Sequence, residues 1–302
     1  MTRAPASPLG ALARLAFGAL CISFSAVFVK LVWREGMGPT AIGFWRTFFG
    51  AAILFGWTLA SGRANGRGLR LDPAVTRLAL AAGCLFFLDL FFWHRSIVYV
   101  GAGMATILAN TQVFGTAVLS YFLFRERLGA VFLAAAVSAV AGVVLLIGVG
   151  SGVRFTPDYV RGVVFGLLTG VVYANFIVVL KLARQRSEAP GPLPLMAWTS
   201  LITACLLGSV GGLTEAGRFV PPNARCVLLL VVLALVAQAL GWWSITSSLP
   251  HLRGSRSGLA LLLQPVLATV WGVVFFGEHL APVQVAGAVV TIAAIYVGSA
   301  RS

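Results

Sequence analysis

Five side chains capable of binding chemistry lie inside long apolar segments of this chain. Asn110, Gln112 and Gln264 carry amides, Asp89 carries a carboxylate and Arg46 carries a guanidinium. Polar groups away from water are costly, so each needs a partner or a ligand. Amides can orient a zwitterion without adding net charge to an apolar interior. These residue types predict a site that holds a small polar molecule.

The motifs of an enzyme or a metal centre are missing from the sequence. There is no Walker motif and no HExxH, and His94, His251 and His279 are scattered. The four cysteines form no CxxC pair. We therefore expect no catalytic residue, no metal and no cofactor.

The composition indicates a membrane as the solvent. Of 302 residues, 59% are hydrophobic and 10% are charged, whereas a soluble domain carries about 25% charged residues. The net charge of +14 is typical of arginine and lysine that set topology and touch anionic lipid headgroups. Nucleic acid is not an expected partner.

Ten apolar segments are each long enough to cross a bilayer, which predicts an all-α membrane protein with ten transmembrane helices. They cover about 12–32, 40–60, 75–98, 101–124, 128–149, 160–182, 193–213, 224–248, 255–276 and 280–299. Glycine and proline mark the breaks between them. On helix six, Gly162, Gly166 and Gly170 recur every fourth residue and predict a close helix–helix seam.

The stretch Thr106–Leu128 reappears as Gly258–Leu280. Gln112 falls on Gln264 by an offset of 152 residues, and two glutamates repeat with the same spacing. An apolar chain built from two copies of one unit is typical of transporters with a site between the copies. We expect one five-helix repeat in 1–150 and a second in 151–302. Because five is odd, the second copy must be inverted in the membrane.

The repeated glutamates are Glu126 and Glu278, which precede the fifth and tenth segments. A negative charge stabilises a helix N-terminus, so both are interpreted as caps of the helices that follow them. On this topology 14 basic residues lie on the side of the termini and 8 on the other side. This excess predicts both termini in the cytoplasm of a multi-pass inner-membrane protein.

Depth along the helices selects the candidate site. At about 1.5 Å per residue, Asn110, Gln112 and Gln264 lie near the middle of the bilayer, and ordinary helix–helix contacts are the alternative role for them. Pro265 removes a hydrogen bond from helix nine and favours a cavity beside it, with a simple packing kink as the alternative.

Asp89 is the acidic residue deepest within a predicted span. Arg46 begins helix two from the same side at a similar depth, so an ion pair between them is geometrically feasible, and pairing makes buried charges tolerable. We expect a structural pair, with proton coupling through Asp89 as the alternative.

Aromatic residues fall where they could form the wall of a cavity. Trp93, Tyr173 and Trp242 offer flat apolar faces with a polar edge, and Asn175 lies close to Tyr173 in the sequence. Helix packing is the alternative role for each. The combined prediction is an amide-rich polar end and an aromatic apolar end to one binding site.

The chain resembles the drug/metabolite transporter superfamily, EamA type, over essentially its whole length. The resemblance rests on the ten spans, on Phe44–Thr47, on the run from Asp89 to Ile97, on Leu108–Asn110, on the two Glu-x-Leu helix ends and on Gln264-Pro265. Val113 departs from it, since many relatives have proline there. The resemblance implies a secondary carrier, often an exporter, most similar to exporters of aromatic and other hydrophobic amino acids.

The expected function is therefore export of an amino acid or related small metabolite by alternating access. A carrier of another class, such as a nucleoside, a sugar derivative or a drug, is the first alternative. A non-transporting membrane scaffold is the second. The expected partners are a small-molecule substrate and membrane lipids, and the oligomeric state is left open, a monomer included.

Overall fold

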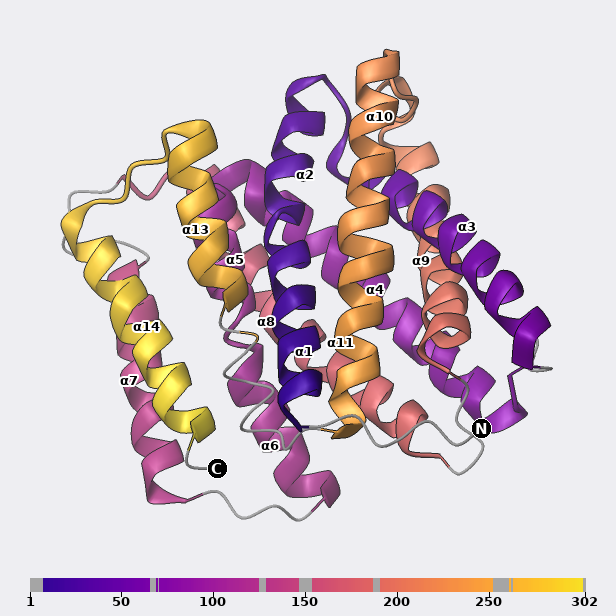
Figure 1. Cartoon of the computed structure of the whole chain (residues 1–302). Helices are drawn as coiled ribbons and strands as arrows, with labels where there is room; N and C mark the ends of the chain where they lie inside the picture. The colour runs from indigo at the N-terminus through magenta and orange to yellow at the C-terminus, as the bar shows by residue number, and fades with distance from the viewer. Residues whose placement is uncertain are drawn as a thin grey trace.

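The described part of the chain is helical and contains no strand. This computed structural model describes residues 8–65, 69, 71–124, 129–146, 154–186, 191–251, 261 and 263–300. The helices in these residues (Figure 1) are α1 (Pro8–Ser23), α2 (Ser25–Arg34), α3 (Pro39–Asn65), α4 (Pro73–Val100), α5 (Ala102–Ala109), α6 (Gln112–Phe124), α7 (Ala130–Leu146), α8 (Pro157–Gln185), α9 (Pro192–Thr214), α10 (Ala224–Leu233), α11 (Trp242–Ser248), α13 (Leu263–Phe276) and α14 (Pro282–Ala300). A π-helix, η2 (Ala234–Gly241), joins α10 to α11, and the short 3₁₀ turns η1 (Ala216–Arg218) and η3 (Leu249–His251) follow α9 and α11.

Proline begins helices in this chain. Pro39, Pro73, Pro157, Pro192 and Pro282 are each the first residue of a helix. A proline at that position loses no hydrogen bond, because the first N–H groups of a helix have no partner inside it. The side chains of Asp72, Thr156 and Asn223 accept hydrogen bonds from the first turns of α4, α8 and α10. The glycine- and proline-rich breaks in the sequence are thus helix starts.

Seven described segments are long and apolar enough to cross a membrane. They are Gly10–Arg34, Pro39–Ser61, Pro73–Val100, Ala102–Leu123, Pro157–Gln185, Pro192–Thr214 and Ala224–Ser248. Three shorter apolar helices are Ala130–Leu146, Leu263–Phe276 and Pro282–Ala294. Large apolar side chains such as Phe122, Val137 and Val289 are exposed on the outside, as a lipid-facing surface requires. The prediction of an all-helical, multi-span membrane protein is confirmed.

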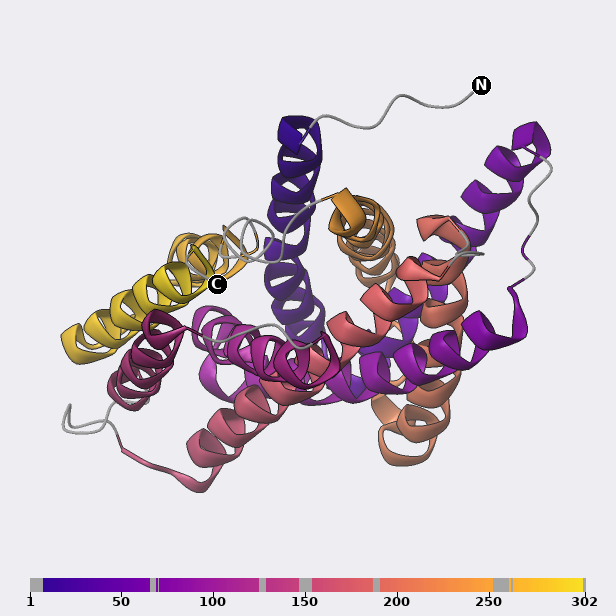
Figure 2. The ribbon, with the colours of Figure 1, turned by 90° about the horizontal axis from the view of Figure 1, so that it is seen from below.

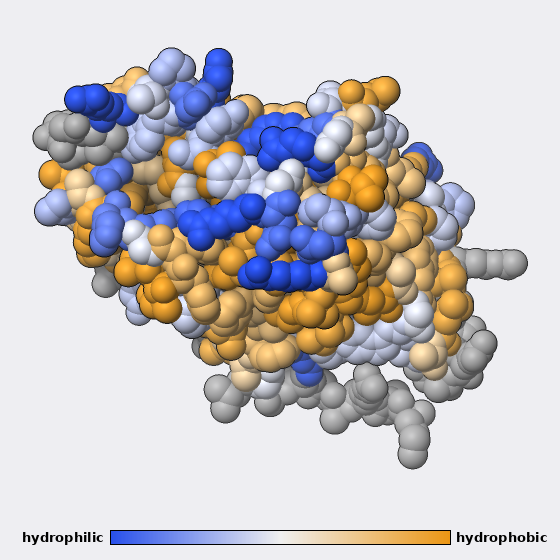
Figure 3. Space-filling model, turned by 90° about the horizontal axis from the view of Figure 1, so that it is seen from above, coloured by the Kyte–Doolittle hydropathy of each residue, from blue (hydrophilic) through white to orange (hydrophobic). Residues whose placement is uncertain are grey.

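The helices form pairs that run across the bundle. In Figures 1 and 2, α7 and α14 lie side by side at one edge, α3 and α9 pair at the other, and α4 packs along α8 between them. The start of α1 and the end of α14 lie on the same, lower side in Figure 1. Figure 3 shows hydrophilic residues gathered on the upper face, surrounded by apolar ones.

Acidic side chains join the ends of paired helices on this upper side. Glu215, which follows α9, accepts hydrogen bonds from the backbone N–H groups of Thr40 (2.9 Å) and Ala41 (3.0 Å) at the start of α3. Its Oε1 also lies 3.2 Å from Nη2 of Arg95. The end of α9 therefore meets the beginning of α3, and the two helices are antiparallel.

Glu278 makes the same kind of joint between α13 and α5. It follows α13 and accepts from the backbone N–H groups of Ala102 (3.0 Å) and Gly103 (3.3 Å) at the start of α5, while Nζ of Lys30 donates to it at 2.6 Å. At the third pair, Nε2 of Gln284 in the first turn of α14 donates to the carbonyl of Leu146, which ends α7. All three pairs are antiparallel.

The expected role of Glu278 as the cap of its own following helix is wrong. Its carboxylate caps α5, which lies about 175 residues away in the chain. The N–H of Ala281, at the start of α14, donates to Oε1 of Gln284 instead. The physical rule was correct, because a carboxylate does stabilise a helix N-terminus, but the helix concerned belongs to the other half. Glu126 lies outside the described residues.

The Glu278 joint predicts a stability effect. Glu278→Gln removes the charge that holds Lys30 and two N–H groups of α5, so we expect a loss of about 1–3 kcal/mol of unfolding free energy, as for hydrogen bonds to charged groups. The matched control is Asp158→Asn, which breaks the exposed Arg161–Asp158 pair and should change stability by less than about 0.5 kcal/mol. Denaturant unfolding of the purified protein in detergent measures both, and equal effects would contradict the prediction.

The predicted glycine seam on α8 is present. A Cβ placed on Gly162 would lie 2.6 Å from Cβ of Tyr99, and one on Gly166 would lie 2.8 Å from Cβ of Leu108. On Gly170 it would collide with Oγ1 of Thr111. Only glycine allows α8 to approach α4 and α5 this closely, which brings the middle of α8 against the end of α5.

This seam gives a second stability prediction. Gly166→Ala should destabilise the fold by about 1–3 kcal/mol through overpacking, despite the better helix propensity of alanine. In the control Gly56→Ala on α3, nothing lies within 4 Å of the new Cβ, so propensity alone should act and stability should rise by up to about 1 kcal/mol. Thermal unfolding measures the change in stability of each variant. A change of the same sign in both would contradict the prediction that α8 is closely packed at Gly166.

Candidate functional site

A cavity of about 50 Å³ lies in the middle of the bundle. By volume it holds about four water molecules, which is less than the several hundred Å³ of a typical ligand pocket. Substrate binding therefore requires the surrounding helices to move apart. The lining residues are Ile22, Ser23, Ser25, Arg46, Phe86, Asp89, Leu90, Trp93, Thr106, Ala109, Asn110, Thr169, Tyr173, Trp242 and Gln264.

Interrupted helices contribute much of this lining. The span Gly10–Arg34 is broken at Phe24, between α1 and α2, and the span Ala102–Leu123 is broken at Asn110 and Thr111, between α5 and α6. The span Ala224–Ser248 passes through the π-helix η2 just before Trp242. Irregular backbone at membrane depth occurs where it is buried in protein or lines a wet cavity, and π-helical turns are frequent at functional sites.

Asn110 sits on the break in the fourth span, with a side chain only partly free to bind a ligand. Its Nδ2 donates to the carbonyl of Thr106 at 2.9 Å, and Oγ1 of Thr111 donates to the carbonyl of Leu108 at 2.7 Å. Asn110 thus stabilises the end of its own helix and also lines the cavity.

The break in the first span is packed against α13. Nε1 of Trp271 donates to Oγ of Ser23 at 3.0 Å, and its ring stacks on Phe24 at 4.7 Å. Ser23 and Ser25 flank Phe24 and both line the cavity. Gln264 lines it from α13, next to Pro265, which lies in the first turn of α13 as described. The ends of two helices from opposite halves therefore meet at the cavity.

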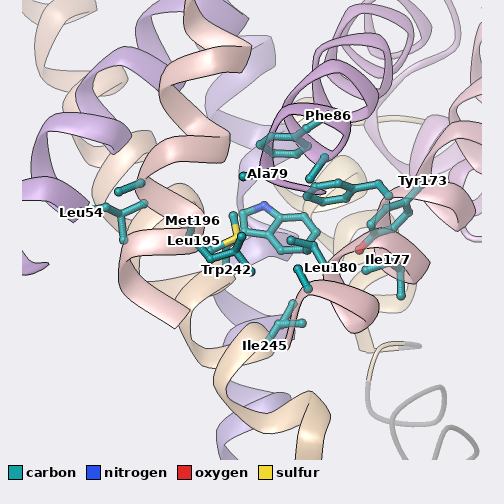
Figure 4. Packing of buried hydrophobic residues seen from close by; sticks show 14 of the residues in the cluster. Leu54, Ala79, Phe86, Tyr173, Ile177, Leu180, Leu195, Met196, Trp242 and Ile245 are labelled. Carbon is teal, nitrogen blue, oxygen red and sulfur yellow. The ribbon is translucent and has the colours of Figure 1, made fainter. Parts of the chain in front are cut away.

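Aromatic rings form one wall. Trp242 lies edge-on to Phe86 at 5.4 Å, to Phe176 at 5.2 Å and to Tyr173 at 6.0 Å, and Phe86 stacks on Phe176 at 4.8 Å. Figure 4 shows Trp242 in the middle of the large apolar cluster, with Phe86 and Tyr173 around it. Such a wall fits an apolar or aromatic group.

Arg46 and Asp89 reach the cavity from α3 and α4, and both are buried, with 2% and 7% of their surface exposed. The expected direct ion pair is not formed among the described residues. The two side chains line the same cavity instead. Asp89 Oδ1 and Arg46 Nε have no hydrogen-bond partner in the described structure.

His94 holds the guanidinium of Arg46. Nδ1 of His94 lies 3.0 Å from the carbonyl of Pro39 and must donate to it, because a carbonyl only accepts. Nε2 of a neutral imidazole is then an acceptor, and it lies 3.5 Å from Nη1 of Arg46. The Arg46 guanidinium also faces the ring of Trp93 at 6.0 Å. These contacts fix the guanidinium beside the cavity.

Buried polar atoms without a partner concentrate here. In the described structure, five side chains that line the cavity have such an atom: Ser25 Oγ, Arg46 Nε, Asp89 Oδ1, Trp242 Nε1 and Gln264 Nε2. Each unsatisfied group costs about 1–3 kcal/mol, so they call for water or a ligand.

The structure brings together seven of the nine candidate residues and leaves two outside. Asn110, Gln264, Trp93, Tyr173, Trp242, Asp89 and Arg46 line the cavity. Gln112 follows the helix break, and its Oε1 accepts from Oγ1 of Thr116. Asn175 lies about 200° further round α8 than Tyr173, and its Nδ2 donates to the carbonyl of Val171. Neither faces the cavity.

Sequence reasoning missed Ser25, Thr106, Thr169 and His94. The three hydroxyl residues are common in membrane helices, where they usually bond to the preceding turn, as Thr106 and Thr169 do. Nothing in the sequence distinguishes the cavity-facing ones. The position of His94, on the same predicted helix as Asp89 and next to Trp93, is a sequence signal that could have placed it near the site.

A wet cavity predicts chemical access. With Cys21, Cys84, Cys205 and Cys226 replaced by alanine, Ser25→Cys should react with a charged, water-soluble methanethiosulfonate, because the thiolate forms only where water reaches it. Val270→Cys is the control, since Val270 is 44% exposed on the outside of α13, where lipid surrounds it. Electrophoretic mobility after labelling distinguishes them. The reagent is larger than the roughly four waters that the cavity holds, so labelling of Ser25→Cys requires the helices to move apart. Labelling of Val270→Cys without Ser25→Cys would exclude opening of the cavity to water.

Broken helices around a buried cavity that several polar side chains line, inside a multi-span apolar bundle, are typical of membrane transporters. The comparisons with known proteins agree. A model described as the EamA-like transporter family matches residues 10–148 and again residues 160–299. The chain belongs to the EamA-like transporter family.

Relatives of this chain are also transporters by name. A "Probable amino-acid metabolite efflux pump" of Salmonella typhimurium is 29% identical over 65% of this chain and 67% of its own length, and the Escherichia coli protein of the same name is 27% identical over the same shares. The "Uncharacterized inner membrane transporter YhbE" of Escherichia coli is 24% identical over 76% of this chain and 71% of its own. One solved crystal structure, 23% identical, superposes with a TM-score of 0.70 over 97% of this chain and 99% of the other and shows the same fold.

Proposed function

We propose that this protein exports amino acids with aromatic or other apolar side chains, or closely related metabolites, by alternating access. The observation that carries the proposal is the central cavity, which is lined both by charged and amide side chains and by aromatic rings. An amino acid with an apolar side chain offers partners to both kinds of group. The names of two relatives point to the same substrate class.

The proposed architecture is ten transmembrane helices in two inverted repeats, residues 1–150 and 151–302. Three observations support it. The family model matches twice, in 10–148 and 160–299. The pairs α3/α9, α5/α13 and α7/α14 each unite corresponding helices of the two halves and run antiparallel. The contact of α4 with α8 also has its counterpart in that of η2 and α11 with α1, as a twofold axis in the membrane plane requires.

In this proposal the cavity opens alternately to each side while helix groups rock about it. Asn110 and Gln264 hold the polar end of the substrate, and Trp93, Tyr173 and Trp242 hold the apolar body. The protein is a carrier and not an enzyme. The excess of basic residues on the side of the termini favours cytoplasmic ends in the inner membrane.

Counterflow tests this function. Proteoliposomes preloaded with an unlabelled amino acid should accumulate the labelled one, with aromatic and branched apolar amino acids moving fastest. Asn110→Ala and Gln264→Ala should reduce the rate about tenfold or more, since each removes a polar contact to the substrate. Asn175→Ala and Gln112→Ala are matched amide controls outside the cavity and should transport within about twofold of the parent.

Two outcomes would contradict the proposal. Movement of nucleosides or sugar derivatives without amino acids would favour the alternative substrate class, and no movement of any compound would favour a scaffold. Equal losses in the cavity variants and the control variants would remove Asn110 and Gln264 from the site even if amino acids are carried.

A further inference from the structure

Arg46 and Asp89 are ionisable groups of opposite sign that line one cavity without forming a direct ion pair. Both are almost fully buried, and neither forms an ion pair with another described residue. Buried charges without a direct partner are costly. The direct contact that a purely structural pair would make is missing, so a group that satisfies both side chains has a place between them.

The unpartnered atoms around the cavity have a definite pattern. Nε of Arg46, Nε1 of Trp242 and Nε2 of Gln264 are hydrogen-bond donors, whereas Oδ1 of Asp89 is an acceptor. Oγ of Ser25 can do either. Three donors, one of them cationic, match a carboxylate, and an anionic acceptor matches an ammonium group.

We propose that the cavity recognises both charges of a free amino acid, with Arg46 binding the α-carboxylate and Asp89 the α-ammonium. This inference rests on the proposed function and narrows its substrate to the zwitterion. An amine alone would leave Arg46 unpaired, a carboxylate alone would leave Asp89 unpaired, and a neutral nucleoside or sugar would leave both.

His94 is a positioning residue in this arrangement. Its Nδ1–H is fixed on the carbonyl of Pro39, which leaves Nε2 to hold Arg46. The Trp93 ring, 6.0 Å from the guanidinium, restricts Arg46 from the other direction. The guanidinium is thus held in place before the substrate arrives, which reduces the entropy lost on binding.

The test compares competitors that lack one charge. Labelled phenylalanine counterflow is measured with unlabelled phenylalanine, N-acetylphenylalanine (no ammonium) or phenylalaninamide (no carboxylate) as competitor. If another amino acid gives larger counterflow, its own N-acetyl and amide derivatives are used. For the parent, each derivative should compete at least about tenfold more weakly than the free amino acid, the cost of one charge-assisted contact.

The variants assign each charge to its residue. Arg46→Gln should abolish the discrimination against phenylalaninamide and keep that against N-acetylphenylalanine, and Asp89→Asn should do the reverse. Each discrimination is a ratio measured within one protein, so a smaller folded fraction does not alter it. Arg161→Gln and Asp158→Asn make the same changes in the exposed pair and should keep both ratios.

The outcomes separate this inference from the proposed function. Counterflow of amino acids with equal competition by the derivatives would overturn the inference alone. So would variants that change both ratios together, since Arg46 and Asp89 would then act on the fold and not on separate substrate groups. A complete absence of amino-acid counterflow would overturn the inference and the proposed function together.

Discussion

A polar group buried in a bilayer must find a partner, and this requirement explains most of the structure. At the upper ends of the helices, Glu215 and Glu278 satisfy the free N–H groups of α3 and α5. Along the helices, hydroxyls such as that of Thr106 bond to the preceding turn. Where the helices are interrupted, at Phe24, at Asn110–Thr111 and in η2, the irregular backbone surrounds one cavity. Several buried polar atoms without a partner in the described structure belong to side chains that line this cavity.

Sequence reasoning selects candidate residues by their depth along the helices, but it does not give the direction of their side chains. Counting residues from the helix ends placed Asn110, Gln264 and Asp89 near one level, and the structure gathers them around one cavity. The same count admitted Gln112 and Asn175, which face elsewhere. Depth follows from the number of residues, whereas the direction of a side chain depends on helix rotation. The helix break at Asn110 and Thr111 changes the direction in which the following side chains face. The sequence has no proline or glycine at these two positions that would predict the break.

The helix joints show a second limit. The spacing of Glu126 and Glu278 revealed the duplication, and the doubled family match agrees with it. The helix that Glu278 caps could not be read from the sequence, because the partner N–H groups of Ala102 and Gly103 belong to the other half. Antiparallel packing of corresponding helices places the end of one beside the start of the other, so Glu215 and Glu278 each cap a helix of the other half. The chemistry of a capping residue is local, but its partner is set by tertiary structure.

The joints and the cavity together constrain how transport can be driven. The joints of Glu215, Glu278 and Gln284 lie on the same side of the bundle, so opening the cavity to that side must disturb at least some of them. A substrate can shift this equilibrium only by the difference in its affinity for the two states. In the proposed mode of binding, the unpartnered atoms of Arg46, Asp89, Trp242 and Gln264 supply that difference, because a ligand that pairs with them offsets the cost of their burial. The joints at the helix ends would then oppose opening of the cavity to their side, and binding of the substrate would favour it.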